Sequence, residues 1–281
     1  MTRGGRAGVV LRQLVVLLVG GVVALVADRA GATTWLLSVT GLRPFGRPVT
    51  LVPPPSAGVP LAQWRGAHTG ASLLLVVGQS QAANFAEREP VEADSLWVLL
   101  EDRVVRATAP LPGAEGTGGS LWPRVLRGAG DSVVVAVVAI GATTMADWAP
   151  GGPGWTLVSR RLDAASAAGL RVRRVVLMVG EADAARGTSE SAWRAAFGRF
   201  RGGLRARAVE APIVVVRESR CFGVAPSAVI RRAQAAVVDG RSVVVGPDLD
   251  ALDHRMRWDG CHLSRAGLHW MASALGPHRG R

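Results

Sequence analysis

The stretch LLLVVGQSQAANF, from Leu73 to Phe85, joins an uninterrupted apolar run to Gly78, Gln79 and Ser80. Continuous apolar runs are typical of strands that are buried on both faces of a parallel sheet. A hydroxyl placed directly after such a strand lies at the edge where α/β proteins bind their ligands. We therefore take Ser80 as a candidate nucleophile, with the N-cap of a following helix as its alternative role.

Similar segments recur along the rest of the chain. Apolar runs rich in β-branched residues lie at 72–77, 132–140, 174–179, 213–217 and 242–245. Segments with helical periodicity lie at 156–168, 189–208, 225–238 and 264–275, and a hairpin is expected at 96–108. Strands that alternate with helices predict a three-layer α/β/α domain around a parallel five-stranded sheet. We expect this domain to cover residues 72–281.

A base and an orienting acid for the serine are found near the carboxyl terminus, in the stretch WDGCHLSRAG. A serine hydroxyl attacks an ester only when an adjacent base takes its proton, and histidine does so near neutral pH. Asp259 and His262 are three residues apart, so one turn can bring the carboxylate against the imidazole. The sequence therefore predicts a catalytic triad of Ser80, His262 and Asp259.

Four blocks carry a family resemblance: GQSQAAN at Gly78, GATTMADW at Gly141, GEAD at Gly180 and DGCHLS at Asp259. In this order they resemble blocks of the SGNH (GDSL-like) hydrolases, most closely the carbohydrate acetylesterase and sialate O-acetylesterase branch. The segment GTGGSLWPRVL from Gly116 resembles the branch's glycine-rich segment. The resemblance covers roughly residues 72–275. It implies a flavodoxin-like α/β/α fold and a serine esterase that acts on acylated saccharides without a cofactor.

The resemblance also implies an oxyanion site built from the backbone N–H groups of Ser80 and Gly141. The family adds a side-chain amide as a third donor, but Val179 and Ala182 stand at the two positions where family members carry it. Loss of one such donor typically costs about 10²–10³ in rate. The third donor is therefore either replaced by another side chain or missing.

Five residues at the predicted strand ends are expected to contact the substrate: Gln79, Asn84, Trp148, Glu181 and Asp183. The amide of Gln79 or Asn84 would supply the missing donor, and Trp148 would form a pocket wall. The two acids have helix capping as their alternative role. No cluster of histidine, cysteine and carboxylate residues has metal-ligand spacing, so we expect no metal.

The amino terminus predicts export. Three arginines precede an uncharged run from Leu14 to Ala27, which fits the core of a signal peptide and is short for a membrane span of about 20 residues. Residues 1–32 are therefore interpreted as a signal peptide or an N-terminal anchor that holds the protein at the membrane. Residues 33–71, which contain VPPPSAGVP, are interpreted as a linker.

Cys221 and Cys261 both lie near predicted strand ends. In an exported protein two such cysteines are expected to form a disulfide, which here would hold the loop of His262. A cysteine nucleophile is disfavoured, because Cys261 is the sequence neighbour of His262 and adjacent side chains diverge.

Composition and motif spacing bound the remaining alternatives. The net charge is +12, but all 33 basic residues are arginine and no run of five basic residues occurs, so no nucleic-acid partner is predicted. A lipase of the α/β-hydrolase fold requires Gly-x-Ser-x-Gly, and Ala82 replaces the last glycine. Two alternatives stay open: an SGNH-type O-acyltransferase acting on an envelope glycan, and a catalytically weak glycan-binding domain.

Overall fold

The computed structural model of the chain describes residues 49–89 and 95–276. Their sheet has eight strands in the order β1-β4-β3-β5-β2-β6-β7-β8. The bounds are β1 Val59–Pro60, β2 Ser72–Gly78, β3 Leu96–Leu99, β4 Arg103–Ala107, β5 Val133–Ala139, β6 Val172–Met178, β7 Ile213–Arg217 and β8 Val243–Asp248. The predicted α/β class is confirmed, and the five predicted strands are present. The predicted count of five strands is wrong. The hairpin β3–β4 joins the sheet beside β5, and β1 pairs with β4.

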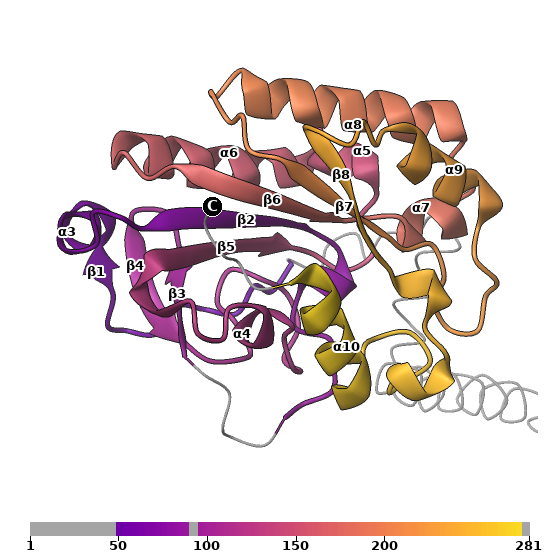
Figure 1. Cartoon of the computed structure of the whole chain (residues 1–281), viewed down its shortest axis with the longest axis horizontal. Helices are drawn as coiled ribbons and strands as arrows, with labels where there is room; N and C mark the ends of the chain where they lie inside the picture. Colours follow the sequence, from indigo (N-terminus) through magenta and orange to yellow (C-terminus); the bar gives the residue numbers. More distant parts are fainter. Residues whose placement is uncertain (1–48, 90–94, 277–281) are drawn as a thin grey trace, which may run out of the picture.

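Helices cover both faces of this sheet and complete the three layers (Figure 1). Their bounds are α3 Leu61–Ala67, α4 Trp122–Val125, α5 Met145–Trp148, α6 Pro153–Ala167, α7 Glu181–Ala185, α8 Glu190–Arg205, α9 Ala228–Ala236 and α10 Arg265–Leu275. In Figure 1, α6, α8 and α9 lie over one face, and α4 and α10 lie over the other. The four helices expected from periodicity are found as α6, α8, α9 and α10, each within three residues of its expected bounds.

Strand β2 shows why a continuous apolar run marks the centre of this fold. Leu73, Leu75 and Val77 pack into the core on one face of the sheet, and Leu74 and Val76 pack into the core on the other. All five side chains are buried, so neither face of the strand tolerates polar residues. The strand lies between β5 and β6, to which it is parallel. Strands β3 to β5 lie on one side of β2, and β6 to β8 lie on the other. The edge at such a switch in strand order is where α/β sheets bind ligands.

The predicted linker is partly wrong. Residues 33–48 lie outside the described residues, but β1 and α3 form an ordered edge of the domain. Val59 pairs with Val104 of β4, and the side chains of Leu61 and Trp64 are buried. These two residues are three apart and therefore lie on one face of α3. The prolines in this segment favoured a linker, although a short helix, α3, follows them and packs on the sheet.

The predicted signal peptide or anchor, residues 1–32, lies outside the described residues. Among residues 49–89 and 95–276, no helix is both long enough and apolar enough to cross a membrane.

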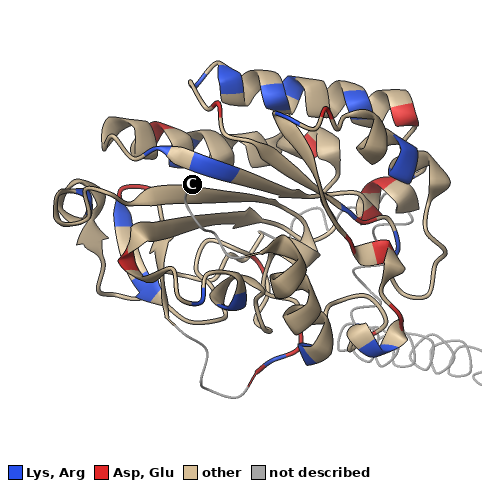
Figure 2. Ribbon diagram, viewed as in Figure 1, with Lys and Arg blue, Asp and Glu red and all other residues tan. Residues whose placement is uncertain are grey.

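The arginines are distributed over the molecule rather than gathered at one place. Figure 2 shows them along α8, α9 and several strands, with acidic residues between them. Several are ion-paired, as in Arg201 with Asp239 and in Arg231 with both Asp248 and Asp250. This distribution fits the interpretation of the positive charge as compositional, and the lack of a nucleic-acid partner stays a prediction.

Candidate active site

Ser80 begins the 3-10 turn η1, Ser80–Ala82, two residues beyond the end of β2. The turn requires glycine at position 78, because a β-carbon there would lie 2.3 Å from the carbonyl oxygen of Met178 on β6. Ser80 is 7 % exposed. The N-cap of the turn is Gln79, and no side-chain hydrogen bond caps it. Ser80 is therefore not an N-cap, and its hydroxyl remains a candidate for chemistry.

The structure brings the Asp259 carboxylate and the His262 imidazole together. The distance between Asp259 Oδ2 and His262 Nδ1 is 2.6 Å. The other oxygen, Oδ1, accepts the backbone N–H groups of Cys261 at 2.9 Å and His262 at 2.7 Å. Burial raises the pKa of Asp259, but these hydrogen bonds outweigh it, chiefly the one from His262, and the pKa lies below its ordinary value. The carboxylate therefore remains ionised and orients the ring.

Two phenylalanines that the sequence interpretation missed hold the same ring. The Phe85 ring stacks on the imidazole with a centroid distance of 5.3 Å, and the Phe222 ring meets it edge-on at 6.1 Å. Phe85 follows η1, and its carbonyl oxygen accepts the indole N–H of Trp258 at 3.0 Å. These contacts join the segment after Ser80 to the loop that carries His262.

Glu181, the first residue of α7, links the turn of Ser80 to the loop of His262. Its carboxyl oxygens accept the side-chain amides of Gln79 at 2.5 Å and Gln81 at 3.0 Å. The Gln81 amide also donates to the carbonyl oxygen of Cys261 at 2.9 Å. Both neighbours of Ser80 therefore bind one carboxyl group, and one of them reaches the residue before His262. The Glu181 carboxyl group thereby fixes the side chains on both sides of Ser80.

A second acid lies near Glu181 in the same buried region. Glu218 follows β7 and is fully buried, and neither of its carboxyl oxygens has a hydrogen-bond partner among the described residues. Burial raises the pKa of both acids, and the charge of Glu181 raises that of Glu218 further. The protonated form of Glu218 is therefore favoured more than in a solvent-exposed glutamate, since an unpaired buried charge is costly.

Gly141 occupies the position expected for the second oxyanion donor. Gly78 and Ala139 are partners in the β2–β5 ladder, and Ser80 and Gly141 each lie two residues beyond them. The Gly141 N–H, however, donates to Oε2 of Glu115 at 2.9 Å. A side chain that the sequence interpretation did not select thus binds a group expected to hold the oxyanion.

Asn84 and Gln79, the side chains expected to replace the third oxyanion donor, are hydrogen-bonded to other protein groups. Asn84 is fully buried, and its side chain exchanges two hydrogen bonds with the backbone of Leu111 at 2.7 and 2.9 Å. The Gln79 amide nitrogen donates to Glu181, and the Gln79 amide oxygen accepts the N–H of Ala182 at 3.3 Å. Because both side chains bind protein groups, the structure supplies no support for either as an oxyanion donor or as a substrate contact.

The other residues expected to contact the substrate are also buried. Trp148 packs in the core under α6 and α8, where its indole N–H donates to Thr143 Oγ1, so its assignment as a pocket wall is wrong. Asp183 accepts the backbone N–H of Met145 at 2.9 Å and thereby joins α7 to α5. Glu181 is 5 % exposed and binds the two glutamines described above. All three side chains are therefore engaged within the protein.

The predicted disulfide between Cys221 and Cys261 is confirmed, with a Cα–Cα distance of 4.4 Å. It fastens the loop of His262 to the segment after β7. The two sulfurs and a carboxyl oxygen of Glu181 lie within 4.8 Å of one another, a grouping with the spacing of metal ligands. Because a metal binds the thiolate form, this grouping has no ligand sulfur while the bridge is intact.

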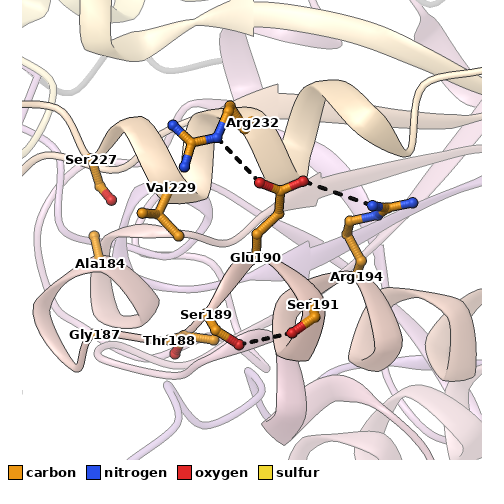
Figure 3. A pocket seen from close by; sticks show the side chains of 10 residues that line it. All are labelled: Ala184, Gly187, Thr188, Ser189, Glu190, Ser191, Arg194, Ser227, Val229 and Arg232. Atoms are coloured by element: carbon orange, nitrogen blue, oxygen red, sulfur yellow. Dashed lines mark hydrogen bonds and ion pairs between the residues drawn. The ribbon is translucent and has the colours of Figure 1, made fainter.

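A separate pocket of about 550 Å³ lies between α7, α8 and α9 (Figure 3). Glu190 lies across it and pairs with both Arg194 and Arg232. Its lining includes none of the three predicted triad residues. The pocket is therefore distinct from the Ser80–His262 region, and its cationic side chains are already paired with an acid.

A protein-family model matches more than half of this chain. The family described as carbohydrate esterase, sialic acid-specific acetylesterase matches residues 115–277. The matched residues contain Asp259 and His262 and begin after Ser80. A search of curated proteins finds no match.

Solved structures share the fold at low sequence identity. A protein from Arabidopsis thaliana superposes with a TM-score of 0.58 at 15 % identity, covering 73 % of this chain and 96 % of that one. A carbohydrate acetylesterase family member from Sinorhizobium meliloti superposes with a TM-score of 0.48 at 13 % identity, covering 73 % and 95 %. The likeness to the first of these supports the α/β/α assignment.

Proposed function

We propose that this chain, which belongs to the carbohydrate esterase, sialic acid-specific acetylesterase family, is a serine esterase that removes acetyl or other short acyl groups from saccharides. The observation that carries the proposal is the hydrogen bond between Asp259 and His262, on a loop tied by Glu181 and Gln81 to the turn of Ser80. A carboxylate on Nδ1 of a histidine is the arrangement that prepares the ring to act as the base for a serine nucleophile.

The first half of the reaction transfers the acyl group to the enzyme. The Ser80 hydroxyl oxygen attacks the ester carbonyl carbon, and its proton passes to Nε2 of His262. The Nδ1–H of the ring donates to Asp259, which stabilises the imidazolium that forms. The tetrahedral intermediate then expels the sugar alkoxide, which takes the proton from His262 and leaves as an alcohol. The acyl group remains bonded to Ser80.

The second half returns the enzyme to its starting state. A water molecule gives a proton to His262 and attacks the acyl carbon, and the carboxylic acid leaves as the proton returns to Ser80. In both halves the negative charge on the carbonyl oxygen requires N–H donors. The backbone N–H groups of Ser80 and Gly141 are the proposed donors.

The test is turnover of p-nitrophenyl acetate and of acetylated sugars by the wild type, Ser80→Ala and His262→Ala. Each substitution is expected to lower kcat by about 10⁶-fold with little change in melting temperature, because these groups react but contribute little core packing. Full activity of Ser80→Ala would exclude it as the nucleophile. Acyl transfer to an added acceptor sugar in preference to hydrolysis would indicate a transferase.

We further propose that the protein works outside the cytoplasm, delivered by residues 1–32. The disulfide supports this location, because such bonds persist in oxidising compartments. A reporter that works only outside the cytoplasm, fused after Arg281, should be active on the full chain and inactive after deletion of residues 1–32. An intact fusion that is inactive and stays in the cytoplasm would contradict export.

A further inference from the structure

The carboxylate of Glu115 lies in the region of the proposed reaction and has no role in it so far. It accepts the Gly141 N–H at 2.9 Å. A β-carbon built on Gly141 would lie 3.4 Å from Glu115 Oε2 and 3.5 Å from Phe85 Cζ. The Phe85 ring in turn stacks on His262. Glu115, Gly141, Phe85 and His262 thus form one continuous set of neighbours at the end of β2 and β5.

The backbone holds Glu115 firmly at this place. Its N–H donates to the carbonyl oxygen of Ala139, the last residue of β5, at 3.0 Å. Its carbonyl oxygen accepts the N–H of Asn84 at 2.9 Å, and it forms an isolated bridge with Leu51. Displacing the carboxylate therefore requires side-chain rotation rather than movement of the loop.

A carboxylate on this N–H opposes the proposed chemistry in two ways. It takes the hydrogen bond that the developing oxyanion needs, and its negative charge repels the oxyanion at short range. A glutamate side chain is ionised near neutral pH in water. Productive binding of an ester therefore requires that the carboxylate leave the Gly141 N–H. Other hydrogen-bond donors must then take its place, since a partly buried carboxylate is costly to leave unpaired.

We propose that Glu115 is a specificity-determining residue that favours esters carrying free hydroxyl groups next to the acyl group. Hydroxyl groups of the substrate donate to the carboxylate, draw it away from the Gly141 N–H and open the oxyanion site. A simple ester has no such donor and meets the closed site. The inference rests on the proposed esterase function and assigns to Glu115 the preference for saccharide esters over simple esters.

The test compares kcat/KM for two substrates: p-nitrophenyl acetate, which has no hydroxyl group, and a monoacetylated hexose. In Glu115→Ala the value for p-nitrophenyl acetate should rise about tenfold or more, because one oxyanion donor is worth about 10²–10³ in rate. Glu115→Gln removes the charge but keeps an amide oxygen that can accept the Gly141 N–H, so its value should rise less. The value for the acetylated hexose should stay level or fall. The ratio of hexose ester to simple ester should therefore fall at least tenfold in Glu115→Ala.

Glu87→Gln is the matched control. This glutamate lies two residues beyond Phe85, and its carboxylate accepts the Arg265 N–H at 2.9 Å instead of the glycine. Glu87→Gln also removes one negative charge near the site, without changing a side chain that binds Gly141. The ratio of hexose ester to simple ester should therefore stay within twofold of the wild type. A ratio that stays within twofold in both Glu115 variants, or that falls equally in the control, would overturn the proposal.

Labelling of Ser80 by an organophosphonate separates this proposal from the one on which it rests. A wild type that is not labelled and hydrolyses neither substrate would overturn both. A wild type that is labelled, combined with an unchanged substrate ratio in the Glu115 variants, would overturn only the role of Glu115. Faster labelling of Glu115→Ala than of the wild type is the expected result, because the phosphonyl oxygen needs the same N–H donors.

Discussion

Three side chains surround the imidazole of His262, and each constrains it differently. Asp259 engages Nδ1, which leaves Nε2 as the nitrogen that accepts a proton. The rings of Phe85 and Phe222 contact it from two directions, one stacked and one edge-on. Because the side chain is only 9 % exposed, the ring orientation is set by these contacts rather than by solvent.

At the residue scale, Asp259→Asn should lower kcat for p-nitrophenyl acetate by about 10⁴-fold. An asparagine fits the same space, but its amide can hold the imidazole in the wrong tautomer, so the geometry survives while the base is lost. The measurement is steady-state turnover with melting temperature as a folding check. Asp253→Asn makes the same chemical change in an exposed turn of that loop, where the carboxylate caps Arg255 and Met256, and should keep its activity. Activity of Asp259→Asn within tenfold of the wild type would exclude its orienting role.

The residues that sequence reasoning found are those whose chemistry depends on local spacing. Asp259 and His262 meet because they are three residues apart, and Ser80 is marked by its place after a buried strand. Glu115 and Phe222 could not be found in this way, because tertiary packing alone brings them to the site. Trp148 was misassigned because a block near the ligand edge can still direct its aromatic side chain into the core.

At the scale of elements, the ends of β2 and β6 and the loop before α10 converge on one carboxyl group. Glu181→Ala should lower kcat at least tenfold with little change in KM, because it frees both neighbours of Ser80 without touching substrate. Glu181→Gln keeps a carbonyl oxygen for one amide donor and should recover part of the loss. Turnover and KM of the two variants check this. Equal loss in both, or a loss that falls on KM alone, would contradict a positioning role.

Asp183, which joins helices α5 and α7, is buried, and its burial predicts a pH dependence of stability. Burial raises the pKa of Asp183 to about 6, from an ordinary value of 3.8. Between these values the folded state binds more protons than the unfolded state, so the free energy of unfolding falls as pH rises. The full difference corresponds to about 3 kcal/mol, lost between about pH 4 and pH 6.

Asp183→Asn should remove this part of the fall, since its amide oxygen can still accept the Met145 N–H. Urea unfolding at pH 4 and pH 7 measures it as the difference between variant and wild type. Glu181 and Glu218 change stability in the same direction, because their pKa values are also raised, so the wild-type profile alone does not isolate Asp183. A pH profile of Asp183→Asn that parallels the wild type would contradict the assignment.

The central strands and long helices could be predicted because each has a clear sequence pattern over many residues. Strands buried on both faces give continuous apolar runs, and α8 and α10 have helical periodicity with serine N-caps. The edge of the sheet could not be predicted in this way. β1 has two residues and α3 has seven. Both are too short to show a strand or helix periodicity within a proline-containing segment.

At the scale of the whole molecule, the disulfide joins two loops that lead into helices on opposite faces of the sheet. Cys221 lies between β7 and α9, which packs with α8 on one face, whereas Cys261 precedes α10 on the other face (Figure 1). The bridge spans a sequence separation of 40 residues. Loop-closure entropy in the unfolded chain assigns such a crosslink about 4 kcal/mol of stabilisation. Its removal should therefore lower the melting temperature by about 8–16 °C for a domain of this size.

The double variant Cys221→Ser/Cys261→Ser tests this at temperatures well below its own melting point. Its kcat should fall further than global unfolding explains, because Cys261 is the neighbour of His262 and its carbonyl oxygen anchors Gln81. A base displaced by about 1 Å costs on the order of 10²-fold in rate. Wild-type protein treated with a reductant should show the same loss and regain activity on reoxidation. Two free thiols in unfolded, unreduced protein from an oxidising compartment would contradict the bridge. Unchanged melting and activity in the double variant would contradict its role in holding the histidine.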